Sequence, residues 1–288
     1  MHDNQQFHWL YGIEEKAIQE NKETELLRHL IEVILRGNVG SLDAILASDR
    51  LAAMQKTNMA NFNSVSKTLM SYWLDAASND DLLSCLDSIF PDPFITRVRD
   101  WNNRNLIPAN VFNDHFSRGQ MQSKLWLLDI LELAVSNKRL GNVVLYGGWY
   151  GTVNLMLHER FNVKHTYNLE IDTMSRQLST SFNEGLPFTA VNADVTALAW
   201  EDNKLGGIIS ANTIINTSSE HMNDDWFHNI PDGKLVVLQT NDYFDCNQHV
   251  NCVLNLEAAQ EKYQFSNLLY SGELQTQLYN RFMLIGVK

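Results

Sequence analysis

Beyond residue 110, short apolar runs alternate with stretches of helical periodicity, and this alternation restricts the fold more than any other feature. The apolar runs cover residues 142–146, 164–170, 188–193, 207–216 and 234–240. Helical patterns follow them at 152–161, 174–183, around 219–227 and at 256–263. Strands that alternate with helices form βαβ crossovers, which build a mostly parallel sheet covered by helices on both faces. The sequence therefore predicts an α/β fold.

Two further strand-like runs, 265–270 and 279–287, end the alternation. The segment SGELQTQL that joins them is too short to hold a crossover helix, so the two strands are expected to pair antiparallel. Residues 106–288 are thus predicted to form a Rossmann-like, doubly wound and mostly parallel sheet with an antiparallel last strand.

The first 105 residues show helical periodicity only. Within 23–36, apolar residues recur on one stripe of an α-helix, and Gly37 follows as a natural C-terminal stop. Further helices are expected at 41–53, 65–77 and 80–90. We therefore predict a separate helical domain or cap over residues 1–105.

Charge and cysteine content restrict the partners and the compartment. A formal net charge of −12 over 288 residues disfavours nucleic acid as a partner, because binding to phosphate backbones needs clustered Lys and Arg. The three cysteines, Cys85, Cys246 and Cys252, are too few for a disulfide framework and favour a reducing, cytoplasmic location. No stretch approaches the roughly 20 apolar residues that span a bilayer. We expect a partner that is a small molecule or a protein, with no membrane contact; the sequence does not predict the oligomeric state.

The stretch VVLYGGWYG, residues 143–151, has the pattern of a strand, a tight glycine turn and the start of a helix. Such a turn usually faces a nucleotide-like ligand, and Glu170 ends the next strand roughly 20 residues on, at the spacing of an acid that binds a ribose. Glycines that serve only the packing of the strand on the helix are the plain alternative. The turn is unusual because Trp149 and Tyr150 stand at its centre.

These features resemble the class I S-adenosylmethionine-dependent methyltransferases. The resemblance implies methyl transfer as the activity and S-adenosyl-L-methionine as the cofactor. It places five turn residues at the cofactor: Gly147, Gly148, Trp149, Tyr150 and Gly151. It also implies that Glu170, with Asp172 as the second candidate, accepts hydrogen bonds from the ribose hydroxyls, and that Asp194 lies near the adenine amino group.

Two positions depart from the family pattern. Leu145 stands where these enzymes usually carry an acidic residue, and Trp149 replaces the middle glycine of the turn. Two interpretations stay open: Trp149 and Tyr150 form a stacking or substrate-gating wall, or they block an inherited site. In the second case the protein is a non-catalytic scaffold or partner-binding module that has lost its cofactor.

An NAD(P)-dependent oxidoreductase is a weaker alternative. The dinucleotide fingerprint G-x-G-x-x-G would begin at Tyr146, so its first glycine is missing. The predicted hairpin at 265–287 fits dehydrogenases poorly, and no second α/β substrate domain follows.

The segment NTSSEH, residues 216–221, follows the fourth predicted strand and supplies candidates for the reaction. Asn216 ends the strand. Thr217 and Glu220 have the spacing of a capping box, so a helix start explains both. His221 is a candidate general base, because an imidazole exchanges protons near neutral pH; a surface or helix-terminal histidine is the alternative.

The fifth predicted strand ends in QTNDY, residues 239–243. Polar side chains at the carboxyl end of a strand suit substrate binding by Gln239 and Asn241, with Tyr243 as a wall of the catalytic site. Ordinary turn chemistry is the alternative.

Three residues farther along, Cys246, His249 and Cys252, have the residue types of metal ligands. They lie in one short loop with no fourth ligand in view and match no standard zinc pattern. No metal site is therefore predicted.

The polar segment HFSRGQ precedes the first predicted strand. In methyltransferases the corresponding segment often folds over the cofactor, so Arg118 is a candidate to grip a carboxylate of the cofactor or the substrate bidentately. A surface arginine is the alternative. The D/N-P-P-Y/F signature of base methylation has no counterpart, since the nearest string, PDPF at 91–94, indicates a helix stop.

Overall fold

A computed structural model describes residues 67, 70, 92–104, 106–135, 137–200 and 206–288. The chain divides into two compact units, residues 1–121 and 122–288. The helices expected at 23–36, 41–53 and 80–90 lie outside the described residues, and of the helix expected at 65–77 only the helical Lys67 and Met70 are described. Among the helices of the described part, none is both long and apolar enough to cross a membrane.

In the first unit, helices α5 (Pro93–Asn103) and α6 (Ala109–His115) are described. The Asp92 carboxylate accepts the N–H of Phe94 at 2.8 Å and forms a buried ion pair with Lys67, also at 2.8 Å. Proline suits the first helical turn because its missing N–H has no partner there in any case. Residues 92–94 therefore begin α5, whereas the helix stop expected at PDPF concerns residues 80–90, which lie outside the described residues.

The second unit alternates strands and helices along the chain. Its elements begin with α7 (Arg118–Ala134), β1 (Arg139–Tyr146), α8 (Thr152–Arg160), β2 (Asn162–Leu169), α9 (Thr173–Phe182), β3 (Phe188–Val191) and the 3-10 turn η1 (Val195–Ala197). They continue with α10 (Gly206–Ile209), β4 (Thr213–Asn216), the 3-10 turn η3 (Ser219–His221), α11 (Asp225–His228), β5 (Leu235–Asn241), α12 (Leu256–Lys262), β6 (Asn267–Gln275) and β7 (Asn280–Val287).

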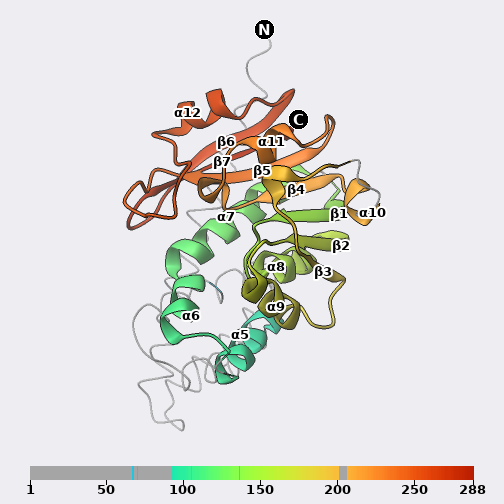
Figure 1. The fold of residues 1–288 in the computed structure, drawn as a ribbon, viewed down its shortest axis with the longest axis vertical. Helices are drawn as coiled ribbons and strands as arrows, with labels where there is room; N and C mark the ends of the chain where they lie inside the picture. Colours follow the sequence, from blue (N-terminus) through green and yellow to red (C-terminus); the bar gives the residue numbers. More distant parts are fainter. Residues whose placement is uncertain (1–66, 68–69, 71–91, 105, 136, 201–205) are drawn as a thin grey trace, which may run out of the picture. The chain divides into compact units, whose positions relative to one another are not determined.

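The strands form one seven-stranded sheet in the order β3-β2-β1-β4-β5-β7-β6 (Figure 1). The strands β1 to β5 pair in parallel, and β7 pairs antiparallel with both β5 and β6. The predicted sheet and its antiparallel end are thus confirmed. The strand order reverses between β1 and β4, and ligands of open α/β sheets bind outside the carboxyl ends of the strands at such a switch point.

Strand β1 is buried on both faces, which explains its continuous apolar run. Val144 and Tyr146 pack into a core cluster on one face, and the alternating Val143 and Leu145 are buried on the other. The first face meets residues of β4, β5, β7, α11 and α12: Ile214, Val236, Leu238, Phe282, Leu284, Trp226, Phe227, Ala259 and Tyr263. Helix α8 packs on β2 and α9 on β3, whereas α12 packs on β6 and β7 (Figure 1).

The expected strand at 207–216 was wrong in its first half. Gly206–Ile209 is the short helix α10, and β4 begins only at Thr213. Ile208 of the helix packs into the same core cluster as the strand residue Ile214. A short apolar run looks alike in a buried helix and a buried strand, so periodicity does not separate the two.

Candidate functional site

The turn after β1 uses left-handed backbone conformations at three places. Gly147 has φ +55°, Trp149 +50° and Gly151 +67°. Glycine adopts such angles freely, whereas a side chain makes them costly by roughly 1–2 kcal/mol. Trp149 therefore stands in a strained conformation that its surroundings must hold.

Two side chains from β2 and its end form hydrogen bonds with the backbone of Trp149. The Trp149 N–H donates to Glu170 Oε2 at 3.1 Å, and Asn168 Nδ2 donates to the Trp149 carbonyl oxygen at 3.1 Å. The Trp149 ring stacks on Tyr150, with ring centroids 4.8 Å apart. These contacts offset the backbone strain, so the surrounding residues stabilise Trp149 in its left-handed conformation.

Two glycines of the turn are required by packing beneath it. A Cβ on Gly148 would lie 2.3 Å from Asn168 Oδ1, and a Cβ on Gly151 would lie 2.7 Å from Asn183 Nδ2. Gly147 differs, because its Cβ would face the loop after β4, at 3.2 Å from the Met222 methyl group. Of the three glycines, Gly147 is the one at which an added Cβ would be least crowded, because its nearest neighbour is the end of the flexible Met222 side chain.

The Glu170 carboxylate lies directly after β2, half-buried beside the turn. Besides the Trp149 N–H, it accepts the N–H of Asp172 through Oε1 at 3.0 Å. Burial raises the pKa of Glu170 above its ordinary value, against the opposing effect of the hydrogen bonds from Asp172 and Trp149. A carboxylate offers about four acceptor sites in all, so Glu170 retains capacity for a further donor.

The other two acidic candidates cap helices. Asp172 accepts the N–H of Ser175 at 2.6 Å and begins α9. Asp194 is exposed after β3 and accepts both the N–H and the hydroxyl of Thr196 through Oδ1. Of Glu170 and Asp172, Glu170 is the acid that faces the turn.

The loop after β4 is fastened to the glycine turn. Asn216 is buried and accepts the N–H of Ser218 at 2.9 Å, and the Ser218 hydroxyl donates to the Gly147 carbonyl oxygen at 3.2 Å. Asn216 Nδ2 also lies 3.4 Å from Met222 Sδ. The candidate Asn216 thus shapes the loop that borders Gly147.

The capping box expected for Thr217 and Glu220 was wrong. The cap of η3 is Ser218, which makes no side-chain capping bond. Glu220 is buried instead, where it accepts a hydrogen bond from Asn241 Nδ2 at 2.7 Å and lies 3.5 Å from the Arg281 guanidinium. A tertiary ion pair takes the place of local capping.

The remaining candidates differ in their surroundings. His221 is exposed, with Nδ1 3.1 Å from the Gln248 carbonyl oxygen. Tyr243 stacks on Tyr279 and makes an edge contact with His249. Gln239 is fully buried and donates to the Ser123 carbonyl oxygen at 2.9 Å, so it secures α7 to the sheet.

Arg118 begins α7 and belongs to the first compact unit, whereas every other candidate belongs to the second. Its contact with a carboxylate of the cofactor or substrate stays a prediction.

No family model matches the sequence, and no curated protein sequence matches it significantly. Solved structures do resemble it. The N-methyltransferase NodS from Bradyrhizobium japonicum WM9, in complex with S-adenosyl-L-homocysteine, superposes with a TM-score of 0.50 at 9% identity, covering 67% of this chain and 98% of NodS. The protein has the class I methyltransferase fold. An S-adenosylmethionine-dependent methyltransferase from Clostridium acetobutylicum ATCC 824 also resembles it, with a TM-score of 0.41 at 12% identity over 58% of this chain and 91% of its own.

Sequence reasoning on this methyltransferase fold missed the residues that support the turn. Asn168 precedes Glu170 by two positions, so strand alternation directs both toward the same side of β2. That alternation is a signal that identifies Asn168. Ser218 and Asn183 carry no such signal, because their partners Gly147 and Gly151 are distant in sequence.

Proposed function

We propose that the protein is an S-adenosylmethionine-dependent methyltransferase that acts on a small molecule or a protein side chain. The observation that carries the proposal is the Glu170 carboxylate, half-buried after β2 and bonded to the glycine turn at the switch point of a methyltransferase fold. An acid at this place suits the two hydroxyls of a ribose.

The residues present fit the cofactor. Glu170 retains acceptor capacity for the ribose hydroxyls, Asp194 is exposed three residues after β3 and would accept from an adenine amino group, and Gly147 offers backbone without a side chain. When bound, S-adenosyl-L-methionine supplies a methyl group already activated on a sulfonium, so the chain mainly aligns the acceptor. His221 is the candidate to receive the acceptor's proton, because its Nδ1 donates to a carbonyl oxygen and its Nε2 carries the lone pair.

The non-catalytic scaffold is the second candidate, and it rests on Leu145 and Trp149. Both departures have packing explanations, since Leu145 is buried in β1 and Trp149 is stacked on Tyr150. Neither residue therefore requires the loss of a cofactor. We favour the enzyme.

Calorimetry and thermal denaturation with S-adenosylmethionine and S-adenosylhomocysteine test the proposal. A ligand that binds only the folded state stabilises it by RT ln(1 + [L]/Kd), about 2.7 kcal/mol at a hundredfold excess over Kd. We expect a rise of the melting temperature with both compounds and none with NAD. No shift with either compound, at concentrations that saturate ordinary methyltransferases, would favour the scaffold.

Glu170→Ala is expected to weaken the affinity for S-adenosylhomocysteine by about 10–100-fold, because hydrogen bonds to a charged acceptor contribute roughly 1.5–3 kcal/mol each. The variant also loses the acceptor for the Trp149 and Asp172 N–H groups, so some stability is lost with it. Calorimetric titration of the folded variant measures the affinity. Glu261→Ala, which removes an exposed acid on α12, is the matched control. An unchanged affinity in a folded Glu170→Ala protein would show that this carboxylate does not bind the ribose.

The raised pKa of Glu170 predicts a pH dependence of binding. Ribose hydroxyls donate hydrogen bonds and therefore bind the ionised carboxylate best, so the affinity should rise as pH increases through the raised pKa, in a window upward from the ordinary value of 4.5. The effect of Glu170 on the free energy of unfolding has the opposite sign. Its stabilising contribution is present below the pKa that Glu170 has in the unfolded chain, and it is lost as pH rises through the higher pKa that Glu170 has in the folded protein. Titrations between pH 4.5 and neutrality should show this rise in the wild type and a flatter profile in Glu170→Gln; identical profiles would contradict it.

A further inference from the structure

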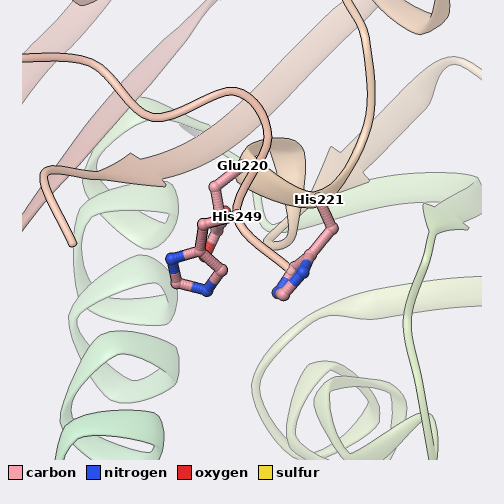
Figure 2. Close-up of side chains that lie close together, drawn as sticks. All are labelled: Glu220, His221 and His249. Carbon is pink, nitrogen blue, oxygen red and sulfur yellow. The ribbon is translucent and has the colours of Figure 1, made fainter. Parts of the chain in front are cut away.

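Three side chains from two separate segments converge beside the end of β4. Figure 2 shows Glu220 and His221 from η3 and His249 from the loop after β5, with the two imidazole rings next to each other and Glu220 reaching toward His249. One potential ligand atom from each of the three residues lies within 4.8 Å of the others. The ring centroids of the two histidines are 4.6 Å apart.

Only one of the two oxygens of the Glu220 carboxylate has a hydrogen-bond partner among the described residues. Oε1 accepts from Asn241 Nδ2 and faces Arg281, whereas Oε2 is shielded from solvent and finds no hydrogen-bond partner among the residues that the structure describes. Only 2% of Glu220 is exposed. A buried carboxylate oxygen without a partner is costly and calls for a further ligand.

In both histidines Nδ1 lies beside a carbonyl oxygen, which favours the tautomer that a metal ligand needs. His221 Nδ1 lies 3.1 Å from the Gln248 carbonyl oxygen, and His249 Nδ1 lies 2.8 Å from the Tyr243 carbonyl oxygen. A carbonyl oxygen only accepts, so each Nδ1 carries the hydrogen and each Nε2 carries a lone pair. Such a bond from the second ring nitrogen to a carbonyl group is the usual support of a metal-bound histidine.

The backbone holds the two segments together. The N–H groups of Val250 and Asn251 donate to the Glu220 carbonyl oxygen, at 2.9 and 3.0 Å. The Asn251 side chain donates to the Met222 carbonyl oxygen at 2.8 Å. The residues directly after His249 are therefore fixed to the turn that carries Glu220 and His221.

We propose that Glu220, His221 and His249 bind a divalent transition-metal ion of the zinc class. Two imidazoles and one carboxylate form a known donor set for such ions, which leaves at least one coordination position open. Ligands at about 2.1 Å from one ion in tetrahedral geometry lie roughly 3.4 Å apart, so binding must bring the three atoms closer than the 4.8 Å limit within which they now lie. His221 is the exposed member of the set, so its side chain has the most freedom to make this movement.

The alternative thiol ligands fit less well. The Cys252 thiol instead lies within hydrogen-bond distance of Asn241 Oδ1, at 3.2 Å, and of the Tyr243 carbonyl oxygen, at 3.4 Å, so protein acceptors already engage it. The expected absence of a metal site came from the local spacing of Cys246, His249 and Cys252; the set proposed here takes only His249 from that loop.

The site also has a consequence for the acceptor, and this step rests on the proposed function. Ser218, two residues before Glu220, donates to the Gly147 carbonyl oxygen, so the same loop borders the glycine turn. An open metal position there suits an oxygen-bearing acceptor such as a hydroxyl compound. A bound metal occupies the Nε2 lone pair of His221, so the general-base role proposed above for His221 applies to the metal-free protein alone.

The test is a titration of the full chain, freed of metal with a chelator, with Zn²⁺ by calorimetry and with Co²⁺ by visible absorption. We expect one ion per chain and a Co²⁺ spectrum typical of nitrogen and oxygen ligands. Loss of a second-shell partner costs 10–100-fold in metal affinity, so His221→Ala and His249→Ala should each weaken binding by at least about that much. His228→Ala, which removes an exposed histidine at the end of α11, is the matched control and should bind like the wild type.

Two outcomes overturn the proposal: no stoichiometric binding of either ion to the wild type, or binding that Cys246→Ser abolishes while His221→Ala retains it. Both histidine variants alter partly or fully exposed side chains, so loss of folding does not obscure the result. Affinity for S-adenosylhomocysteine is measured on the same preparations. Metal binding without cofactor binding would contradict the proposed function alone, and cofactor binding without metal binding would contradict the metal site alone.

Discussion

Arg281→Ala is expected to lower the free energy of unfolding by about 3–5 kcal/mol, because removal of one partner leaves the other buried without a counter-charge. Arg281 of β7 is buried, 3.5 Å from Glu220, and donates to the Thr217 carbonyl oxygen at 3.3 Å and to the Tyr279 hydroxyl at 3.1 Å. Urea denaturation of the wild type and the variant, both freed of metal so that no bound ion replaces the missing counter-charge on Glu220, measures the difference.

Two comparisons sharpen this result. Arg139→Ala removes an exposed arginine at the start of β1 and should change stability little. The double variant Glu220→Gln/Arg281→Met should lose less than Arg281→Ala, because it leaves no isolated charge. A loss below about 1 kcal/mol for Arg281→Ala, the range of an exposed pair, would show that the ion pair is not desolvated in solution.

Gly147→Val is expected to abolish binding of S-adenosylhomocysteine, with a loss of at least about a hundredfold, or roughly 2.8 kcal/mol. Gly147 has φ +55°, which a β-branched residue tolerates least, and its Cβ would press on the Met222 methyl group at 3.2 Å. On the proposed function, the added side chain would also obstruct the approach of the turn backbone to the cofactor. Calorimetric titration of the folded variant measures the loss.

Gly185→Val is the matched control for strain. Gly185 has φ +82°, and no atom lies within 4 Å of the Cβ that the substitution adds. It should lose similar backbone stability and keep its affinity for S-adenosylhomocysteine. If both variants lose the ligand equally, the effect is general destabilisation; if Gly147→Val binds normally, the turn does not contact the cofactor.

The order of strands and helices was predictable because the parallel strands are buried on both faces. A strand such as β1, with Val143 and Leu145 on one side and Val144 and Tyr146 on the other, leaves a continuous apolar signal in the sequence. The signal weakens where an element is short. Ile208 and Ile214 meet in the same core cluster from a helix and a strand, and an apolar run alone does not record which is which.

The site was less predictable because its decisive contacts join distant segments. The T-x-x-E pattern at Thr217 and Glu220 suited a local cap, but a buried Arg281 on β7 binds the carboxylate instead. The strained Trp149 likewise depends on Asn168 and Glu170 of the next strand and its end. Its distance along the chain from the glycine turn made Glu170 a candidate, whereas partners contributed by other strands required the structure.

The position of β7 has a consequence for how the protein folds during synthesis. β7 follows β6 in the chain but lies between β5 and β6 in the sheet. While the ribosome is still adding β7, the outer edge of β5 has no neighbour, and Glu220 lacks the arginine that β7 brings. Unpaired strand edges on a nascent chain favour association with other chains. Residues 280–287 therefore close this edge of the sheet, so a nascent chain needs protection from association most in the interval before they pair with β5.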